Sequence, residues 1–152
     1  MANTFTQIHI HTVFAVHNRE SAIEKSWRDD LYKYLIAIIQ NHGHKVLSIG
    51  GMTDHVHILF GMRPTQSLSD LMQQTKRDSS EWINRTGFTA GKFSWQEGYG
   101  AFSYGKSQVP AVINYISKQE QHHAKISFAD EFKKILDAFG LAYDEKFVFH
   151  KI

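Results

Sequence analysis

Apolar and polar residues alternate over two segments of the chain, residues 7–16 and 54–61. Alternation predicts strands, because successive side chains of a strand point to opposite faces. In the first segment Ile10 and Phe14 would lie on an apolar face, opposite His11. Two further strands are predicted. They cover residues 45–49 and the aromatic and glycine-rich segment 93–104, which we expect to be flexible or bulged at its centre.

Apolar residues at helical spacing predict four helices between and after these strands. The predicted helices cover residues 26–41, 67–84, 110–123 and 128–139. Ser26 is the expected N-cap of the first helix, and Gly43 follows its end. Pro110 suits the first turn of the third helix. A final extended segment is expected at residues 143–149.

The order of elements up to residue 104 is β-α-β-β-α-β. This order is typical of the ferredoxin-like α+β fold, an antiparallel sheet with two helices on one face. We expect an additional C-terminal helix and a single domain over residues 1–152. In the usual strand order the first strand lies beside the third, so His9 and His11 would lie near His55 and His57. The face that carries these histidines would look outward.

Composition limits the class of protein without deciding it. The chain has 152 residues, of which 42% are hydrophobic, so it can bury one core but hardly two. A net charge of +2 permits a nucleic-acid partner without requiring one. The absence of cysteine excludes disulfides and thiolate metal sites and is compatible with the cytoplasm. We find no signal peptide and no apolar run of membrane-spanning length, and therefore expect a soluble cytoplasmic protein.

The segment Asp54-His55-Val56-His57 carries the clearest candidate chemistry. Two imidazoles two residues apart on a strand point the same way and can bind one divalent metal ion. Spacing alone does not establish a site, because histidines on a half-exposed sheet face often only form hydrogen bonds. The segment His9-Ile10-His11 has the same spacing, so some other property must distinguish the two pairs.

The third predicted helix presents polar side chains on one face. Tyr115 and Gln119 are four residues apart and therefore share a face, and His122 and His123 follow one turn later. Taken alone, this pattern is better explained by a half-buried tyrosine that packs and a glutamine that is solvated.

Three motifs together resemble the IS200-like transposases of bacterial insertion sequences, single-tyrosine members of the superfamily named for its His-hydrophobic-His (HUH) motif. The motifs are residues 52–59, 95–103 and 115–123, in the family's order. The resemblance runs over nearly the full chain. It also separates the two histidine pairs, because only His55 and His57 have the flanking residues and the strand position of the motif.

The resemblance implies a single-stranded DNA transposase and endonuclease that acts at hairpin-bearing element ends. His55, His57 and Gln119 would bind Mg²⁺ or Mn²⁺, and Tyr115 would be the nucleophile that forms a 5′-phosphotyrosine. The family also implies a homodimer in which the histidines of one subunit meet the tyrosine helix of the other. A bacterial, nucleoid-associated location in the cytoplasm would follow.

Contacts with DNA are less specific in the sequence. Arg63, Lys76, Arg77 and Arg85 are candidates for binding phosphates, although each by itself is better explained as a solvated charge. Two other functions remain open. The chain could be a noncatalytic module that binds DNA or RNA hairpins, or a metal-dependent phosphodiesterase that uses water instead of Tyr115. Both would still use His55 and His57.

Overall fold

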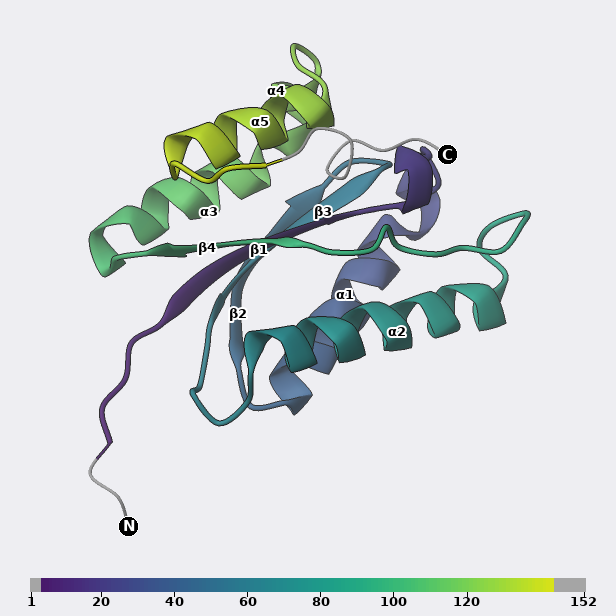
Figure 1. Ribbon diagram of the computed structural model, residues 1–152. Coiled ribbons are helices and arrows are strands. Elements are labelled where there is room, and N and C mark those ends of the chain that lie inside the picture. Colours follow the sequence, from purple (N-terminus) through teal and green to yellow (C-terminus); the bar gives the residue numbers. More distant parts are fainter. Residues whose placement is uncertain (1–3, 144–152) are drawn as a thin grey trace.

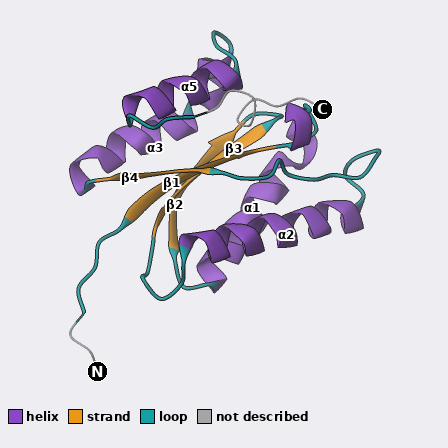
Figure 2. Cartoon of the chain, viewed as in Figure 1, coloured by secondary structure: helices purple, strands orange, loops and turns teal. Residues whose placement is uncertain are grey.

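The computed structural model describes residues 4–143 of the chain. Its four strands form one antiparallel sheet in the order β2-β3-β1-β4 (Figures 1 and 2). The strands are β1 (His9–Ala15), β2 (Lys45–Gly51), β3 (His55–Gly61) and β4 (Gly100–Tyr104). The predicted position of β1 beside β3 and the ferredoxin-like α+β topology are thus confirmed. Beyond Tyr143, the predicted final extended segment lies outside the described residues.

Two long helices, α1 (Lys25–Asn41) and α2 (Leu68–Thr86), cover one face of the sheet (Figure 1). They pack on the apolar face predicted from the alternation, which contributes Phe14, Ile58 and Phe60 to the main hydrophobic core. Fully burying each such side chain stabilises the fold by about 1.5–3 kcal/mol. In residues 4–143, no helix is both long and apolar enough to cross a membrane.

The first helix begins earlier than the sequence suggests. Its N-cap is Glu24, which makes no capping bond with its side chain, so the prediction of Ser26 as N-cap was wrong. The reason is Ile23, which is fully buried and donates its backbone N–H to the carbonyl of Thr53 (2.9 Å). This tertiary contact fixes the chain just before the helix and outweighs the local preference for a serine cap. In α2, by contrast, the Ser67 side chain caps the helix and accepts a hydrogen bond from the backbone N–H of Asp70.

Three helices cover the opposite face of the sheet, which we had expected to look outward. They are α3 (Val109–Ser117), α4 (Gln119–His123) and α5 (Phe128–Ala138), and Figure 1 shows them on the side away from α1 and α2. The expectation was wrong because this face also carries Val13, Leu59 and Phe102. These apolar side chains need a cover, and they become the floor of two smaller cores under α3 and α5.

Two predicted elements are shorter in the structure. The helix expected over residues 110–123 is broken at Lys118, whose φ of −106° and ψ of 23° separate α3 from α4. The strand expected over residues 93–104 is regular only in β4, and its first part forms a single bridge from Trp95 to Val16. Trp95 is buried in the main core, and its indole N–H donates to Ser79 Oγ (2.9 Å), so this part of the chain is held by α2 as well as by the end of β1.

We expect Gly50→Ala to lower the free energy of unfolding by about 1–3 kcal/mol, as overpacking does. A Cβ atom at Gly50 in β2 would lie 2.4 Å from the backbone carbonyl oxygen of Ile116 in α3, so the helix would have to move off the sheet. Urea unfolding measures the change. Gly91→Ala is the matched control, because a Cβ there meets nothing within 4 Å. Equal effects of the two substitutions would contradict close packing of α3 on β2.

Candidate active site

The two histidines of β3 lie on the face covered by α3, α4 and α5, and both side chains are fully buried. Residues two apart on a strand point the same way, which brings both rings toward the C-terminal helices. His55 Nε2 lies 3.0 Å from Gln119 Oε1, and His57 Nε2 lies 3.0 Å from Glu131 Oε1. The structure thus brings the predicted ligand Gln119 to the predicted histidine pair, although the pair is deeper than expected.

Gln119 is the first residue of α4, directly after the break at Lys118, and is 2% exposed. Its Nε2 donates to Glu131 Oε2 (3.0 Å), which fixes the orientation of the carboxamide. As a result its oxygen, the atom that a cation would bind, faces His55.

Glu131 is the central residue that the sequence analysis missed. It lies on α5, is 1% exposed and accepts hydrogen bonds from side chains of β3, α3 and α4. A signal was present in the sequence: Glu131 follows Phe128 by three residues and precedes Ile135 by four. A carboxylate at helical spacing within an apolar stripe must be buried if the helix packs, and a buried carboxylate needs partners.

Tyr115, the predicted nucleophile, is half-buried on α3, and its hydroxyl donates to Glu131 Oε2. Its ring lies edge-on to that of His57, with centroids 5.7 Å apart. Burial, together with the hydrogen bond to the ionised Glu131, raises the pKa of Tyr115 above its ordinary value. The phenol is therefore protonated at neutral pH in this arrangement.

His123 on α4 is a further member of the cluster. Its Nδ1–H donates to the backbone carbonyl of Ile126 (2.8 Å), and its Nε2 lies 3.0 Å from both Gln119 Oε1 and Glu131 Oε1. Although burial opposes it, the hydrogen bond to Glu131 raises the pKa of His123. The neighbouring His122 is more exposed, and its Nε2 lies 3.4 Å from Glu131 Oε2.

The hydrogen bonds of these rings test whether a cation fits here. His55 Nδ1–H faces Asp54 Oδ1 (2.7 Å), so a neutral His55 presents the lone pair of Nε2 to Gln119 Oε1. The Nδ1–H of His123 already donates to Ile126, so its Nε2 can donate to the oxygens that it faces only when the ring is protonated. Acceptors that face each other across 3.0 Å repel unless a proton or a metal ion lies between them.

The spacing of the ligand atoms agrees with this interpretation. One ligand atom each from His55, His57, His123 and Glu131 all lie within 4.8 Å of one another. Ligands about 2.1 Å from an ion and at right angles to each other are about 3.0 Å apart. The cluster therefore has ligand atoms that could hold a divalent metal ion.

Burial sets the charge state of the other groups. Burial lowers the pKa of His57 to about 4 and the pKa of His11 to about 3, so both rings are neutral at pH 7. For Glu131, burial acts in the opposite direction, but hydrogen bonds from His123 and His57 hold the pKa of the carboxyl well below its usual range. Glu131 is therefore the negative charge around which the cluster is built.

The second histidine pair of the sequence is separated by the structure. His11 is buried, and its Nε2 lies 2.8 Å from His57 Nδ1, on the side of that ring away from Glu131. His9 lies at the end of β1, opposite Gly61 and Tyr104. His11 is thus a neighbour of the cluster as predicted, but it does not line up with His55 and His57 as a ligand.

The four candidate DNA-binding cations do not lie with the cluster. Lys76, Arg77 and Arg85 are on α2, beneath the opposite face of the sheet (Figure 1). The ammonium of Lys76 donates to the carbonyls of Gln96 and Gly98 (both 2.6 Å), so it holds the segment before β4.

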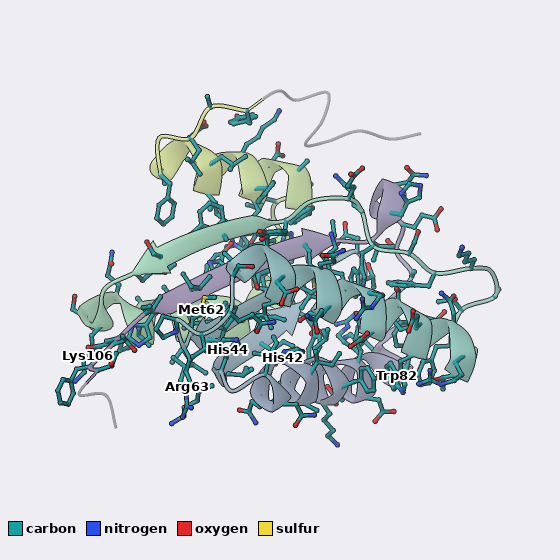
Figure 3. All side chains as sticks on the ribbon, turned by 60° about the horizontal axis from the view of Figure 1, so that its bottom comes forward. His42, His44, Met62, Arg63, Trp82 and Lys106 are labelled. Carbon is teal, nitrogen blue, oxygen red and sulfur yellow. The ribbon has the colours of Figure 1, made fainter. Side chains whose placement is uncertain are left out.

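On the same helix, Arg77 pairs with Asp78 (3.2 Å). Arg63 follows β3, and its backbone N–H donates to His44 Nδ1 (3.0 Å). Figure 3 shows Arg63 beside His42 and His44 at one end of the sheet. These cations therefore form no single patch with the catalytic candidates.

An open cleft of about 520 Å³ leads to Tyr115 between α3 and α5. Its walls include Tyr104, Val112 and Phe139, and Lys134 is its cation. The cleft gives a substrate access to the phenol, and His11 and Glu131 also lie in its lining.

Comparison with known proteins identifies the family. Residues 4–119 match the family described as "Transposase IS200 like", so the chain belongs to the IS200-like transposases. The chain is accordingly a transposase, a class of enzyme that cleaves DNA during transposition. The match ends at Gln119, and both His123 and Glu131 lie beyond it. Among curated proteins, no match to the chain was found.

Two solved structures share the fold. A candidate transposase of Deinococcus radiodurans R1 superposes with a TM-score of 0.62 at 19% identity, over 78% of this chain and 95% of that one. A REP-associated tyrosine transposase bound to a REP hairpin superposes with a TM-score of 0.61 at 12% identity, over 83% of this chain and 74% of that one.

We expect the metal-free protein to lose stability as the pH falls from 7 to 5. The pKa values of His57 and His11 are lowered on folding, so the unfolded chain takes up protons first. At pH 5, each of these two rings therefore lowers the free energy of unfolding by about 2 kcal/mol. The raised pKa of His123 offsets part of this loss. Urea unfolding in EDTA at both pH values measures the net change, and equal free energies would contradict buried neutral rings.

Proposed function

We propose that this transposase is a metal-dependent HUH endonuclease that cleaves and rejoins single-stranded DNA through a covalent 5′-phosphotyrosine on Tyr115. One observation carries the proposal: Tyr115, Gln119 and His57 all contact the single carboxylate of Glu131. A nucleophile and a candidate metal site are thereby held within one cluster. Neither alternative function, a noncatalytic binding module or a phosphodiesterase that uses water, gives a reason for the phenol to lie there.

His55, His57 and Gln119 would hold the metal ion, and the structure adds His123 and Glu131 as candidate ligands. The ion supplies Lewis-acid polarisation of the phosphate and orients it for attack. Mg²⁺ and Mn²⁺ are the proposed cofactors. Because imidazoles dominate this donor set and Mg²⁺ prefers oxygen ligands, we expect Mn²⁺ to bind more tightly.

Tyr115 would attack a backbone phosphate of the bound strand. A bond forms between the phenolic oxygen and phosphorus, and the bond from phosphorus to the 3′ oxygen breaks, which leaves a free 3′-hydroxyl. The phosphotyrosine keeps the energy of the broken bond, so a 3′-hydroxyl can later reverse the reaction without ATP. Glu131 Oε2, which already accepts the phenolic hydrogen bond, is the proposed proton acceptor.

The same contact keeps Tyr115 inactive before substrate binds. With the pKa of Tyr115 raised and that of Glu131 lowered, proton transfer is unfavourable in the described arrangement. We infer that a strand entering the cleft beside Tyr115 displaces or reorients this hydrogen bond. Tyr104 and Phe139 offer stacking surfaces for unpaired bases, and Lys134 offers a charge for a phosphate.

Hairpin-bearing single-stranded DNA is the proposed substrate. One structural neighbour is bound to a REP hairpin, and its fold is shared by this chain. Arg63, Arg77 and Arg85 would contact the hairpin stem outside the cleft, since none of them lies in the cluster. Lys76, whose ammonium is held by two carbonyls, is the weakest of the four candidates.

We expect the purified protein to form a covalent adduct with labelled single-stranded oligonucleotides from the DNA that flanks its gene, in Mn²⁺ or Mg²⁺. Tyr115→Phe removes the nucleophile and His57→Ala a metal ligand, so each should lower the adduct by at least about 10³-fold. A denaturing gel detects the adduct, and EDTA should abolish it. If the protein binds both the oligonucleotide and the metal ion but forms no adduct, the noncatalytic module is favoured. Cleavage of the oligonucleotide without an adduct would favour the phosphodiesterase.

The resemblance also implies a homodimer with composite active sites. In the structure, however, Tyr115 contacts the histidine cluster of its own chain through Glu131. We therefore propose that the described arrangement is complete within one chain, whether or not two chains associate.

Mixing two inactive variants tests this arrangement. Tyr115→Phe keeps the histidines and His57→Ala keeps the tyrosine, so a composite site would regain one intact copy in a mixed dimer. We expect no adduct after the variants are mixed and allowed to exchange subunits. Wild type mixed with either variant is the control for exchange, and recovery of the adduct would instead establish composite sites.

A further inference from the structure

Each histidine of the cluster is held from behind by a partner on its other ring nitrogen. His55 Nδ1 faces Asp54 Oδ1 (2.7 Å), and His123 Nδ1 faces the carbonyl of Ile126 (2.8 Å). For His57 the partner is His11, whose Nε2 lies 2.8 Å from Nδ1. The first two partners are oxygens that can only accept. His11 differs, because a neutral imidazole nitrogen can either donate or accept.

The surroundings of His11 leave this contact as its main polar interaction. The residue is 1% exposed at the centre of β1, paired with Leu59 of β3 and Phe102 of β4. Within residues 4–143, its Nδ1 has no hydrogen-bond partner. Burying an imidazole that makes a single hydrogen bond lowers the stability of the fold. The presence of His11 here therefore indicates a role beyond packing.

We propose that His11 is the positioning residue of His57: its Nε2 accepts the Nδ1–H of His57, which directs the lone pair of His57 Nε2 at a divalent cation. The inference rests on the proposed metal-dependent function. Partners of this kind fix the tautomer and the orientation of a ligand ring and raise its basicity. His11 therefore acts through His57 and does not itself bind the cation.

The proposal also assigns the protons of the pair. Without a cation, His57 Nε2–H donates to the carboxylate of Glu131 (3.0 Å), and its Nδ1 accepts from His11 Nε2–H. When a cation binds, His57 loses the Nε2 proton to solvent and gains the proton of His11 on Nδ1. His11 then takes a proton from solvent on its own Nδ1. The pair carries two N–H protons before and after, and only their positions change.

Two variants separate this role from packing. His11→Gln keeps a polar group that can reach His57 Nδ1, whereas His11→Leu fills the site without one. We expect the Mn²⁺ dissociation constant, measured by calorimetry, to rise about 10–100-fold for His11→Leu and to stay within about threefold of wild type for His11→Gln. Wild-type affinity in His11→Leu, or equal losses in both variants, would overturn the proposal.

A measurement on the unmutated protein keeps the test valid if a variant fails to fold. In wild-type protein labelled with ¹⁵N-histidine, we expect the ring proton of His57 to move from Nε2 to Nδ1 on saturation with Mg²⁺, and that of His11 from Nε2 to Nδ1. A His57 that stays protonated on Nε2, or a protein that binds neither Mg²⁺ nor Mn²⁺, would overturn the proposal. Because neither readout uses DNA, both are independent of the adduct assay that tests the proposed function.

Discussion

The buried carboxylate of Glu131 is the interaction on which the second face of the sheet depends. An ionised group in an apolar interior is stable only when it is paired and hydrogen-bonded, and Glu131 is both, through His57, Gln119, His123 and Tyr115. These partners come from β3, α3 and α4, while Glu131 comes from α5. Docking of the last described helix and assembly of the site are therefore one event. Losing a partner of a buried charge typically costs about 3–5 kcal/mol, so the helices of this face are held by polar contacts as well as by packing.

The sheet separates stability from chemistry. On one face, α1 and α2 bury the large apolar cluster around Phe14, Ile58 and Phe60. On the other, polar side chains are embedded between two smaller apolar clusters. Because alternate residues of one strand serve both faces, the main core holds the backbone that carries His55 and His57. A site of this kind needs its ligands fixed to within about 0.5 Å, and a central strand paired on both sides provides that rigidity.

The position of Glu131 and His123 changes how the family match is to be understood. The match to the IS200-like transposases ends at Gln119, yet the site of this chain continues for another 12 residues to Glu131. The C-terminal helix is thus part of the candidate active site. It also forms one wall of the cleft that leads to Tyr115. The same helix thus supplies the hydrogen-bond acceptor of the buried histidines and shapes the approach of a substrate.

Much of the fold followed from local pattern. Alternation located β1 and β3 and their apolar face, helical spacing located α1, α2 and α5, and the element order specified the β2-β3-β1-β4 sheet. The candidate ligands His55, His57 and Gln119 and the candidate nucleophile Tyr115 came from their spacing together with the family resemblance. These features are readable because each depends on residues a few positions apart.

The tertiary structure alone decided what each face meets. The start of α1 and the burial of the histidine face result from contacts between residues far apart in the chain. Glu131 and His57 are 74 positions apart, and His11 and His57 are 46 apart. No local pattern of apolar and polar residues indicates contacts between residues so far apart in the sequence. The sequence by itself determined which residues could do chemistry. Only the packing of α3, α4 and α5 decided which of them lie together. The physical reason is that a buried carboxylate needs hydrogen-bond donors close to it in space, and these donors come from distant parts of the chain.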